Sequence, residues 1–238
     1  MSSPVATRHH RKIRSFVRRP GRMTPAQKRA LAALYPRWGL SFSNRPLDLE
    51  QIFGRRAPRV LDIGFGDGEA LVTAAANYPD IDYLGVEVHQ PGIGHLLVLM
   101  ERADTHNVRV IEHDVVEVLP SMLADASFDA INLFFPDPWP KKRHHKRRLV
   151  QPTFVAEVVR VLKPGGLFHL ATDWAAYAEH ARDTLAQSES LAPVTAVELG
   201  DDSLAFRAPT KFERRGRRLG HSMTDLYYRN QPVSRDSK

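Results

Sequence analysis

Short apolar stretches alternate with longer amphipathic stretches along the chain from about residue 59 to residue 172. Short apolar runs indicate buried strands, and apolar residues that recur every three or four positions indicate helices. We therefore expect strands at 60–63, 83–87, 108–113, 130–135 and 167–172, with helices at about 69–77, 92–103 and 152–162. Strands separated by helices predict an α/β fold, in which a parallel sheet is covered by helices on both faces.

The two ends of the chain extend this pattern. After the alternating region, residues 194–199 and 225–229 are predicted to form two further strands that close the sheet. Before it, Thr24 and Pro25 combine an N-cap with a proline at the first helical position, which predicts a short helix to about Tyr35. We divide the chain into a basic N-terminal arm with this short helix, residues 1–45, and a domain of residues 46–238.

The positive charge of the chain is concentrated in a few segments. The net charge is +7, yet residues 1–47 contain eleven Lys or Arg and no Asp or Glu. Two further basic clusters lie at 141–148 and 211–218. Clustered cations of this kind indicate an anionic partner such as RNA.

Composition narrows the remaining possibilities. The chain has no cysteine, which excludes disulfides and thiolate metal sites, and its eleven histidines form no H-E-x-x-H motif. No apolar run approaches the ~18 residues that a membrane span needs. We therefore expect a cytoplasmic protein that binds no metal and no membrane.

A glycine-rich turn follows the first predicted strand, in the sequence V-L-D-I-G-F-G-D-G at 60–68. Gly64 and Gly66 place bare backbone next to a ligand at the carboxyl end of the sheet. A dinucleotide site would need a third glycine where the chain has Glu69, and a pyrophosphate would have to approach Asp62. A cationic cofactor without phosphate fits these acids better, and S-adenosylmethionine is the common one.

Two more carboxylates follow predicted strands. Glu87 ends the second strand, 23 residues after Gly64, where an acid can accept hydrogen bonds from both ribose hydroxyls. Asp114 follows the third strand and can accept a hydrogen bond from an adenine amino group. Because the carboxyl ends of parallel strands meet at one edge of a sheet, these two acids and Asp62 together predict one cofactor site.

Asp137 stands between two prolines at the end of the fourth predicted strand. Pro136 and Pro138 restrict the backbone, so this carboxylate has little conformational freedom. A run of basic residues and histidines follows at 141–148. The sequence therefore places a stiff carboxylate beside a segment suited to binding phosphates.

Several motifs are similar to those of the tRNA (guanine-N7-)-methyltransferases, a family of the seven-stranded S-adenosylmethionine-dependent methyltransferases. The matching blocks cover nearly the whole chain: R-S-F-V-R-R at 14–19, I-G-F-G at 63–66, G-V-E-V-H at 85–89, F-F-P-D-P-W at 134–139, A-T-D-W at 171–174, T-K-F-E at 210–213 and R-L-G-H at 218–221. The F-F-P-D-P-W and T-K-F-E blocks are highly specific. The resemblance implies a Rossmann-like seven-stranded sheet, mostly parallel with an antiparallel strand near the end. It also implies methyl transfer to N7 of a guanine in the tRNA variable loop, at position 46 of the tRNA.

At the matching positions, the resemblance implies roles for individual residues. Cofactor contacts are implied at Asp62, Glu87, Asp114 and Asp137, beside the glycine turn, and Asp137 is also the implied catalytic residue. Substrate contacts are implied at Lys141, Asp173, Thr210, Lys211, Phe212 and Glu213. RNA contacts are implied at Arg143, His144, His145, Lys146, Arg147 and Arg148. Asp62 departs from the family pattern, which often has the longer glutamate there.

Methylation at guanine N7 needs no general base, because this nitrogen carries a lone pair at neutral pH. The transition state needs in-line approach to the methyl group and stabilisation of the positive charge that develops on the guanine ring. Asp137 can accept hydrogen bonds from the guanine edge and supply the negative charge. Asp173 is the second candidate for holding the base.

Other interpretations of the same residues remain. A methyltransferase of another RNA or of an amino group is the alternative within the same class, and a non-catalytic RNA-binding protein is the alternative from a different class. A nicotinamide dehydrogenase is disfavoured by Glu69. The expected partner is tRNA, and the expected oligomeric state is a monomer or a homodimer.

Overall fold

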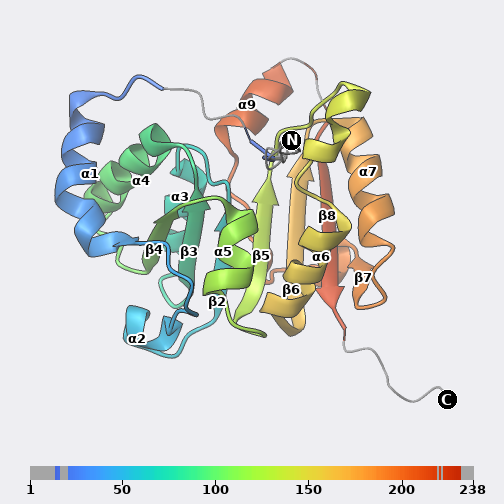
Figure 1. The fold of residues 1–238 in the computed structure, drawn as a ribbon, viewed down its shortest axis with the longest axis horizontal. Helices are drawn as coiled ribbons and strands as arrows, with labels where there is room; N and C mark the ends of the chain where they lie inside the picture. The colour runs from blue at the N-terminus through green and yellow to red at the C-terminus, as the bar shows by residue number, and fades with distance from the viewer. Residues whose placement is uncertain (1–13, 17–20, 219, 221, 232–238) are drawn as a thin grey trace, which may run out of the picture.

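The computed structural model describes residues 14–16, 21–218, 220 and 222–231 of this chain. These residues build a sheet with helices on both faces (Figure 1). The strands are β1 (Gly39–Leu40), β2 (Arg59–Ile63), β3 (Asp82–Glu87), β4 (Val108–Glu112), β5 (Phe128–Phe134), β6 (Leu162–Thr172), β7 (Leu191–Val194) and β8 (Thr224–Asn230). Their order across the sheet is β1-β4-β3-β2-β5-β6-β8-β7.

The directions of the strands match the predicted class. All neighbouring strands from β1 to β6 run parallel. Only β8 is antiparallel, to β6 on one side and to β7 on the other. The expectation of a mostly parallel sheet with an antiparallel strand near the end is confirmed.

The helices form two layers around the sheet. They are α1 (Pro25–Trp38), α2 (Leu49–Phe53), α3 (Glu69–Asn77), α4 (Gln90–Arg102), α5 (Val115–Met122), α6 (Pro152–Val161), α7 (Ala175–Leu185), α8 (Ala196–Leu199) and α9 (Lys211–Arg218), with 3₁₀ turns η1 (Lys142–Arg147) and η2 (Ser203–Ala205). Residues of α5, α6 and α7 share one apolar core with the sheet, and residues of α1, α3 and α4 share the other. Figure 1 shows α5 and α6 in front of the sheet.

The central strands are buried on both sides. Along β2, Leu61 and Ile63 pack in the core of α5, α6 and α7, whereas Val60 packs in the core of α3 and α4. Burial on both faces explains why such strands have nearly continuous apolar sequences instead of alternating ones.

Within the described residues the sheet has eight strands, one more than the seven expected. The extra strand is β1, which is two residues long and pairs Gly39 with Val110 and Leu40 with Ile111. So short a strand has no detectable periodicity. It belongs to the predicted arm region of residues 1–45, as does α1, whose Gln27 donates a hydrogen bond of 3.1 Å to the Pro91 carbonyl. The division of the chain after residue 45 stays a prediction.

The strand predicted at 194–199 is wrong for most of its length. β7 ends at Val194, and the following residues form α8. Thr195 caps this helix by accepting a hydrogen bond from the Glu198 amide, while the Glu198 carboxylate accepts one from the Thr195 amide. This reciprocal capping box starts a helix in a segment whose apolar pattern resembles a strand.

The carboxyl ends of the central strands position the candidate site. β2, β3, β4 and β5 run parallel and end at Ile63, Glu87, Glu112 and Phe134. The loops that follow these four ends therefore emerge at one edge of the sheet, which is where ligands bind in open α/β sheets.

Candidate active site and nucleic-acid interface

A cavity of about 600 Å³ lies at this edge of the sheet. Its wall contains five of the six residues predicted to bind a cofactor, and these are Gly64, Gly66, Glu87, Asp114 and Asp137. The strand ends that were expected to meet therefore do meet. The remaining wall is largely apolar or aromatic, as is usual for sites that bind small molecules.

The glycine turn adopts a backbone conformation that few other residues tolerate. Gly64 and Gly66 have φ angles of 70° and 64°, in the left-handed region that favours glycine. The turn also packs tightly against the first turn of α4, because a Cβ atom on Gly92 would lie 1.9 Å from the Gly66 carbonyl oxygen. The position of the turn is thus fixed by backbone contact.

Glu87 is bound by three backbone N–H groups. Gly66 donates a hydrogen bond of 2.9 Å, Val88 one of 2.6 Å and His89 one of 3.0 Å to its carboxylate. Burial raises the pKa of Glu87, and these donors partly offset the effect by stabilising the charged form. The carboxylate is therefore held in one orientation at the cavity wall.

Asp62 lies apart from this cavity. It is buried beneath the glycine turn, where it lines a cavity of about 30 Å³ together with Phe65, Thr210 and Lys211. Burial, and then the charge of Glu87, raise the pKa of Asp62 to about 7. Of the predicted cofactor ligands, Asp62 is the one that does not line the large cavity, although Gly64 and Gly66 line both cavities.

Asp114 lines the large cavity at the start of α5. Its side chain caps the helix by accepting a hydrogen bond of 3.1 Å from the Val116 amide, and burial raises its pKa. The neighbouring His113 is held by Glu117 at 2.7 Å and stacks on Phe42, with 3.9 Å between the ring centroids. Sequence reasoning did not identify His113 as part of the cavity wall.

The segment that carries Asp137 is strained on both sides of that residue. Phe135 and Trp139 have φ angles of 51° and 45°, which are uncommon for residues other than glycine. The Phe135 amide donates a hydrogen bond of 2.7 Å to the Ala171 carbonyl of β6. Strained backbone of this kind is concentrated at functional sites. The Asp137 carboxylate itself is exposed at the cavity.

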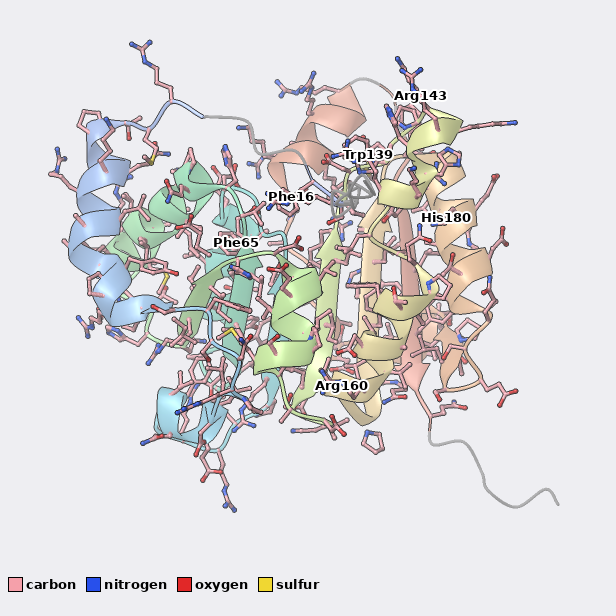
Figure 2. All side chains as sticks on the ribbon, in the orientation of Figure 1. Phe16, Phe65, Trp139, Arg143, Arg160 and His180 are labelled. Atoms are coloured by element: carbon pink, nitrogen blue, oxygen red, sulfur yellow. The ribbon has the colours of Figure 1, made fainter. Side chains whose placement is uncertain are left out.

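The basic run forms the turn η1 directly after this segment. Lys141, Arg143 and Lys146 are exposed, and Figure 2 shows Arg143 at the outer end of the molecule. His144 and His145 are partly buried. Arg148 differs from its neighbours, because it is only 4% exposed and donates a hydrogen bond of 3.0 Å to the Pro138 carbonyl. We therefore assign Arg148 to the support of the Asp137 segment.

The N-terminal arm contributes to the cavity, which sequence reasoning missed. Ser15 and Phe16 line its wall, and Figure 2 shows Phe16 near Trp139. The Trp139 indole donates a hydrogen bond of 2.9 Å to the Ser15 carbonyl. The Arg147 guanidinium lies 3.9 Å from the centre of the Trp139 ring and donates a bond of 3.0 Å to the Arg14 carbonyl. Residues 1–13 and 17–20 of the predicted arm lie outside the described residues.

The predicted substrate residues near the C-terminus lie on α9 and in the turn before it. Thr210 and Lys211 line the small cavity beneath the glycine turn. Glu213 is buried and forms an ion pair with Arg207. Asp173 lies beside the α9 backbone, since a Cβ atom on Gly216 would be 3.4 Å from its carboxylate. The side chain of Phe212 lies outside the described part of the structure.

Two expectations concerned a metal site and a membrane span. Over the described residues, no group of three or more His, Asp or Glu side chains is arranged to hold a metal ion. None of the helices in the same part of the chain combines the length and the apolar character that crossing a membrane requires.

Comparison with known proteins places the chain in a family. Residues 56–226 match the model of a family described as putative methyltransferases. The tRNA (guanine-N(7)-)-methyltransferase of Alkalilimnicola ehrlichii is 55% identical over 93% of this chain and 94% of its own length. Proteins of the same name are 51% identical in Nitrosococcus oceani, over 92% of this chain and 91% of theirs, and 52% identical in Halorhodospira halophila, over 93% and 96%.

Solved structures support the fold independently of sequence. The 16S rRNA methyltransferase KamB has a TM-score of 0.55 at 16% identity, over 79% of this chain and 95% of that chain. The antibiotic-resistance methyltransferase Kmr has a TM-score of 0.53 at 14% identity, over 79% and 93%. Sequence identity near 50% over almost the whole length decides the family: this chain belongs to the tRNA (guanine-N(7)-)-methyltransferases.

Proposed function

We propose that this chain carries out the reaction of its family by transferring a methyl group from S-adenosylmethionine to N7 of a guanine in the tRNA variable loop. One observation carries the proposal. The cavity that is lined by Glu87, Asp114 and Asp137 opens beside η1, so a small-molecule site and a cationic surface are joined through the few residues from Asp137 to Lys142. A site for a cofactor and a site for an RNA backbone thus share one wall.

The residues of the cavity fit S-adenosylmethionine. Its volume of about 600 Å³ is within the range of ~300–1,000 Å³ that is typical of small-molecule sites. Three backbone donors occupy Glu87, and because a carboxylate offers about four acceptor positions, one position remains for a ribose hydroxyl. Asp114 accepts a bond from the Val116 amide and keeps capacity for an adenine amino group. When bound, the cofactor supplies an electrophilic methyl group.

Asp137 is the residue that we assign to catalysis. The left-handed φ angles of Phe135 and Trp139, two residues away on either side, restrict the backbone that carries its carboxylate. A preorganised negative charge stabilises the positive charge that develops on the guanine ring. Because N7 carries a lone pair, no residue has to remove a proton. Lys141, Asp173, Thr210 and Lys211 remain our candidates for contact with the nucleotide.

The exposed cations of η1 are our candidates for binding tRNA phosphates. Arg143 and Lys146 face solvent close to the cavity, as does Lys141 before the turn. Charge of this kind gives affinity for the RNA backbone and fixes the orientation of the base that enters the cavity. A cytoplasmic location, as a monomer or homodimer, completes the proposal and can be checked by cell fractionation and light scattering.

The test compares two tRNAs that differ only at the target guanine. One carries guanine and the other carries 7-deazaguanine, in which a carbon replaces N7. Mass spectrometry of the digested nucleosides should show 7-methylguanosine from the first tRNA and no methylated base from the second, while both bind equally. A methyl group on the deaza base would place the reaction on another atom. Binding of both tRNAs with no methylation of either would favour a non-catalytic RNA-binding protein.

A further inference from the structure

Helix α9 lies near the carboxyl ends of the central strands (Figure 1), and its buried side has an unusual composition. Its sequence is K-F-E-R-R-G-R-R, and the side chains of Lys211, Arg214, Arg215 and Arg218 are exposed. Among the residues of α9 whose burial the structure describes, Glu213 and Gly216 are the buried ones. They are three residues apart and therefore lie on the same side of the helix. A carboxylate and a glycine bury little apolar surface. Among the side chains of α9 that the structure describes, the contacts that hold the helix are therefore polar.

Two ion pairs supply such contacts: Arg214 of α9 pairs with Glu69 of α3, and Arg207 pairs with the buried Glu213. The Nε and Nη2 atoms of Arg207 also donate hydrogen bonds of 2.9 Å and 3.2 Å to the two carboxylate oxygens of Asp225 on β8. Asp225 also lies 2.7 Å from the buried ring of His169 on β6. One arginine therefore connects the basic helix to two strands of the sheet.

This network is well shielded from solvent. The side chains of Arg207, Glu213 and His169 are 12%, 2% and 0% exposed. Burial lowers the pKa of His169, so the imidazole stays neutral, and Arg207 is the cation of the group that balances the two carboxylates. Without Arg207, the buried carboxylate of Glu213 would lack this cation and would lie near the partly buried carboxylate of Asp225. The helix would have to move so that Glu213 could reach water.

Arg207 also contacts the segment that leads to Asp137. Its guanidinium carbon lies 5.8 Å from the ring centre of Phe134 and 5.9 Å from that of Phe135. On the side of α9, the Glu213 amide donates a hydrogen bond of 3.1 Å to the Thr210 hydroxyl, and Thr210 and Lys211 line the cavity beneath the glycine turn. The same arginine thus contacts both α9 and the strand end that leads to the Asp137 segment.

We infer that Arg207 is a positioning residue, which fixes α9 and the start of the Asp137 segment relative to each other, and that Glu213 acts through Arg207 and not on the substrate. The inference rests on the proposed function for its kinetic consequences only. Its structural consequence, the anchoring of α9, concerns the free protein. The two consequences can therefore be measured separately.

The kinetic test is a double-mutant cycle with Arg207→Gln, Glu213→Gln and the double variant, each assayed for kcat/KM with tRNA at saturating S-adenosylmethionine. Arg207→Gln should lower kcat/KM at least tenfold. Glu213→Gln should cost less, because the amide oxygen still accepts a bond from Arg207. The double variant should be at least as active as Arg207→Gln, because the second change removes a buried unpaired carboxylate. Losses that multiply in the double variant would show that Glu213 contacts the substrate itself, and would overturn the inference.

The structural test is hydrogen exchange of the amides of 211–218 without tRNA. Exchange should be at least tenfold faster in Arg207→Gln than in the wild type. The matched control is Arg229→Gln, which breaks the pair of 3.1 Å between Arg229 of β8 and Asp202, and which should leave α9 protected and kcat/KM within about twofold of the wild type. Unchanged exchange of α9 in Arg207→Gln would overturn the inference. A wild-type protein that methylates no tRNA would instead refute the proposed function, and the exchange result would still stand.

Discussion

Asp62 and Glu87 lie on neighbouring strands, and their surroundings stabilise negative charge to different extents. Glu87 accepts hydrogen bonds from three backbone N–H groups, which offset part of its burial. The pKa of Asp62 is raised to about 7, first by burial and then by the charge of Glu87. Asp62 therefore holds a proton below about pH 7.

Replacing Asp62 should stabilise the protein most at alkaline pH. Its pKa of about 7 lies above the ordinary value of 3.8, so the folded wild type loses stability as pH rises from 3.8 to about 7. Asp62→Asn keeps the shape and has no charge to bury. Because one pKa unit corresponds to about 1.4 kcal/mol and the effect accumulates from pH 5 to about pH 7, the difference in unfolding free energy between variant and wild type should grow by about 3 kcal/mol from pH 5 to pH 8. Urea unfolding of both proteins at pH 5 and pH 8 measures this difference in free energy. If the difference were the same at both pH values, Asp62 would not titrate in this range.

Asp137→Ala should remove activity and leave stability unchanged. The carboxylate is exposed, so its removal opens no cavity in the core. Loss of one preorganised electrostatic contact typically lowers kcat by about 10²- to 10³-fold. The control is Asp80→Ala, which changes another exposed aspartate before β3, at the opposite edge of the sheet. Thermal unfolding and kcat with tRNA measure both properties. If Asp137→Ala kept more than about a tenth of the wild-type kcat, the role would pass to Asp173.

At the scale of elements, the sequence predicted those segments whose apolar pattern is decided by burial. β2 and β3 are buried along nearly their whole length, so their apolar runs identified them. The segment at 194–199 has an equally apolar pattern, but the capping box of Thr195 and Glu198 decides in favour of a helix. α9 has no apolar pattern, and the described contacts that hold it include the ion pairs of Glu213 with Arg207 and of Arg214 with Glu69. Elements stabilised by a few polar contacts cannot be recognised by periodicity.

The contact between α4 and the glycine turn lets us predict the effect of a substitution at Gly92. In Gly92→Ala the new Cβ atom would lie 1.9 Å from the Gly66 carbonyl oxygen, so the turn must move. Because the Gly66 amide binds Glu87, we expect at least a tenfold loss of affinity for S-adenosylmethionine and a destabilisation of about 1–3 kcal/mol.

Gly94→Ala is the matched control for this prediction. Its Cβ atom would lie 3.0 Å from Gln27 of α1 and would not reach the glycine turn, so it should lower stability without lowering cofactor affinity. Calorimetric titration with S-adenosylmethionine compares the two variants. Equal affinities would show that the turn can shift without disturbing Glu87.

Across the whole molecule, the predictable part of the site is the part that topology fixes. Glu87, Asp114 and Asp137 follow parallel strands, so one sequence pattern was enough to bring them to one cavity. The contribution of Ser15 could not be predicted, because its contact with Trp139 joins residues 124 positions apart without any shared local pattern. The sequence also could not show which cations of the basic run are exposed and which are buried, because an arginine can adopt either environment.

That difference in exposure leads to a prediction about tRNA binding. Arg143 and Lys146 are exposed, whereas Arg148 is buried and donates to the Pro138 carbonyl. Arg143→Ala and Lys146→Ala should each reduce the slope of log K against log salt by roughly one, because each removes one phosphate contact, and should leave the melting temperature unchanged. Arg148→Ala should leave the slope unchanged but lower the melting temperature and kcat, since the Asp137 segment loses its support.

Titrations of the wild type and the three variants with tRNA at several salt concentrations, combined with thermal unfolding, separate these effects. A reduced slope in Arg148→Ala at wild-type stability would mean that the buried arginine turns outward and meets the RNA. If the slope were unchanged in all three variants, we would conclude that the RNA backbone does not contact η1. The exposed cations of α9 would then be the next described surface to test for RNA binding.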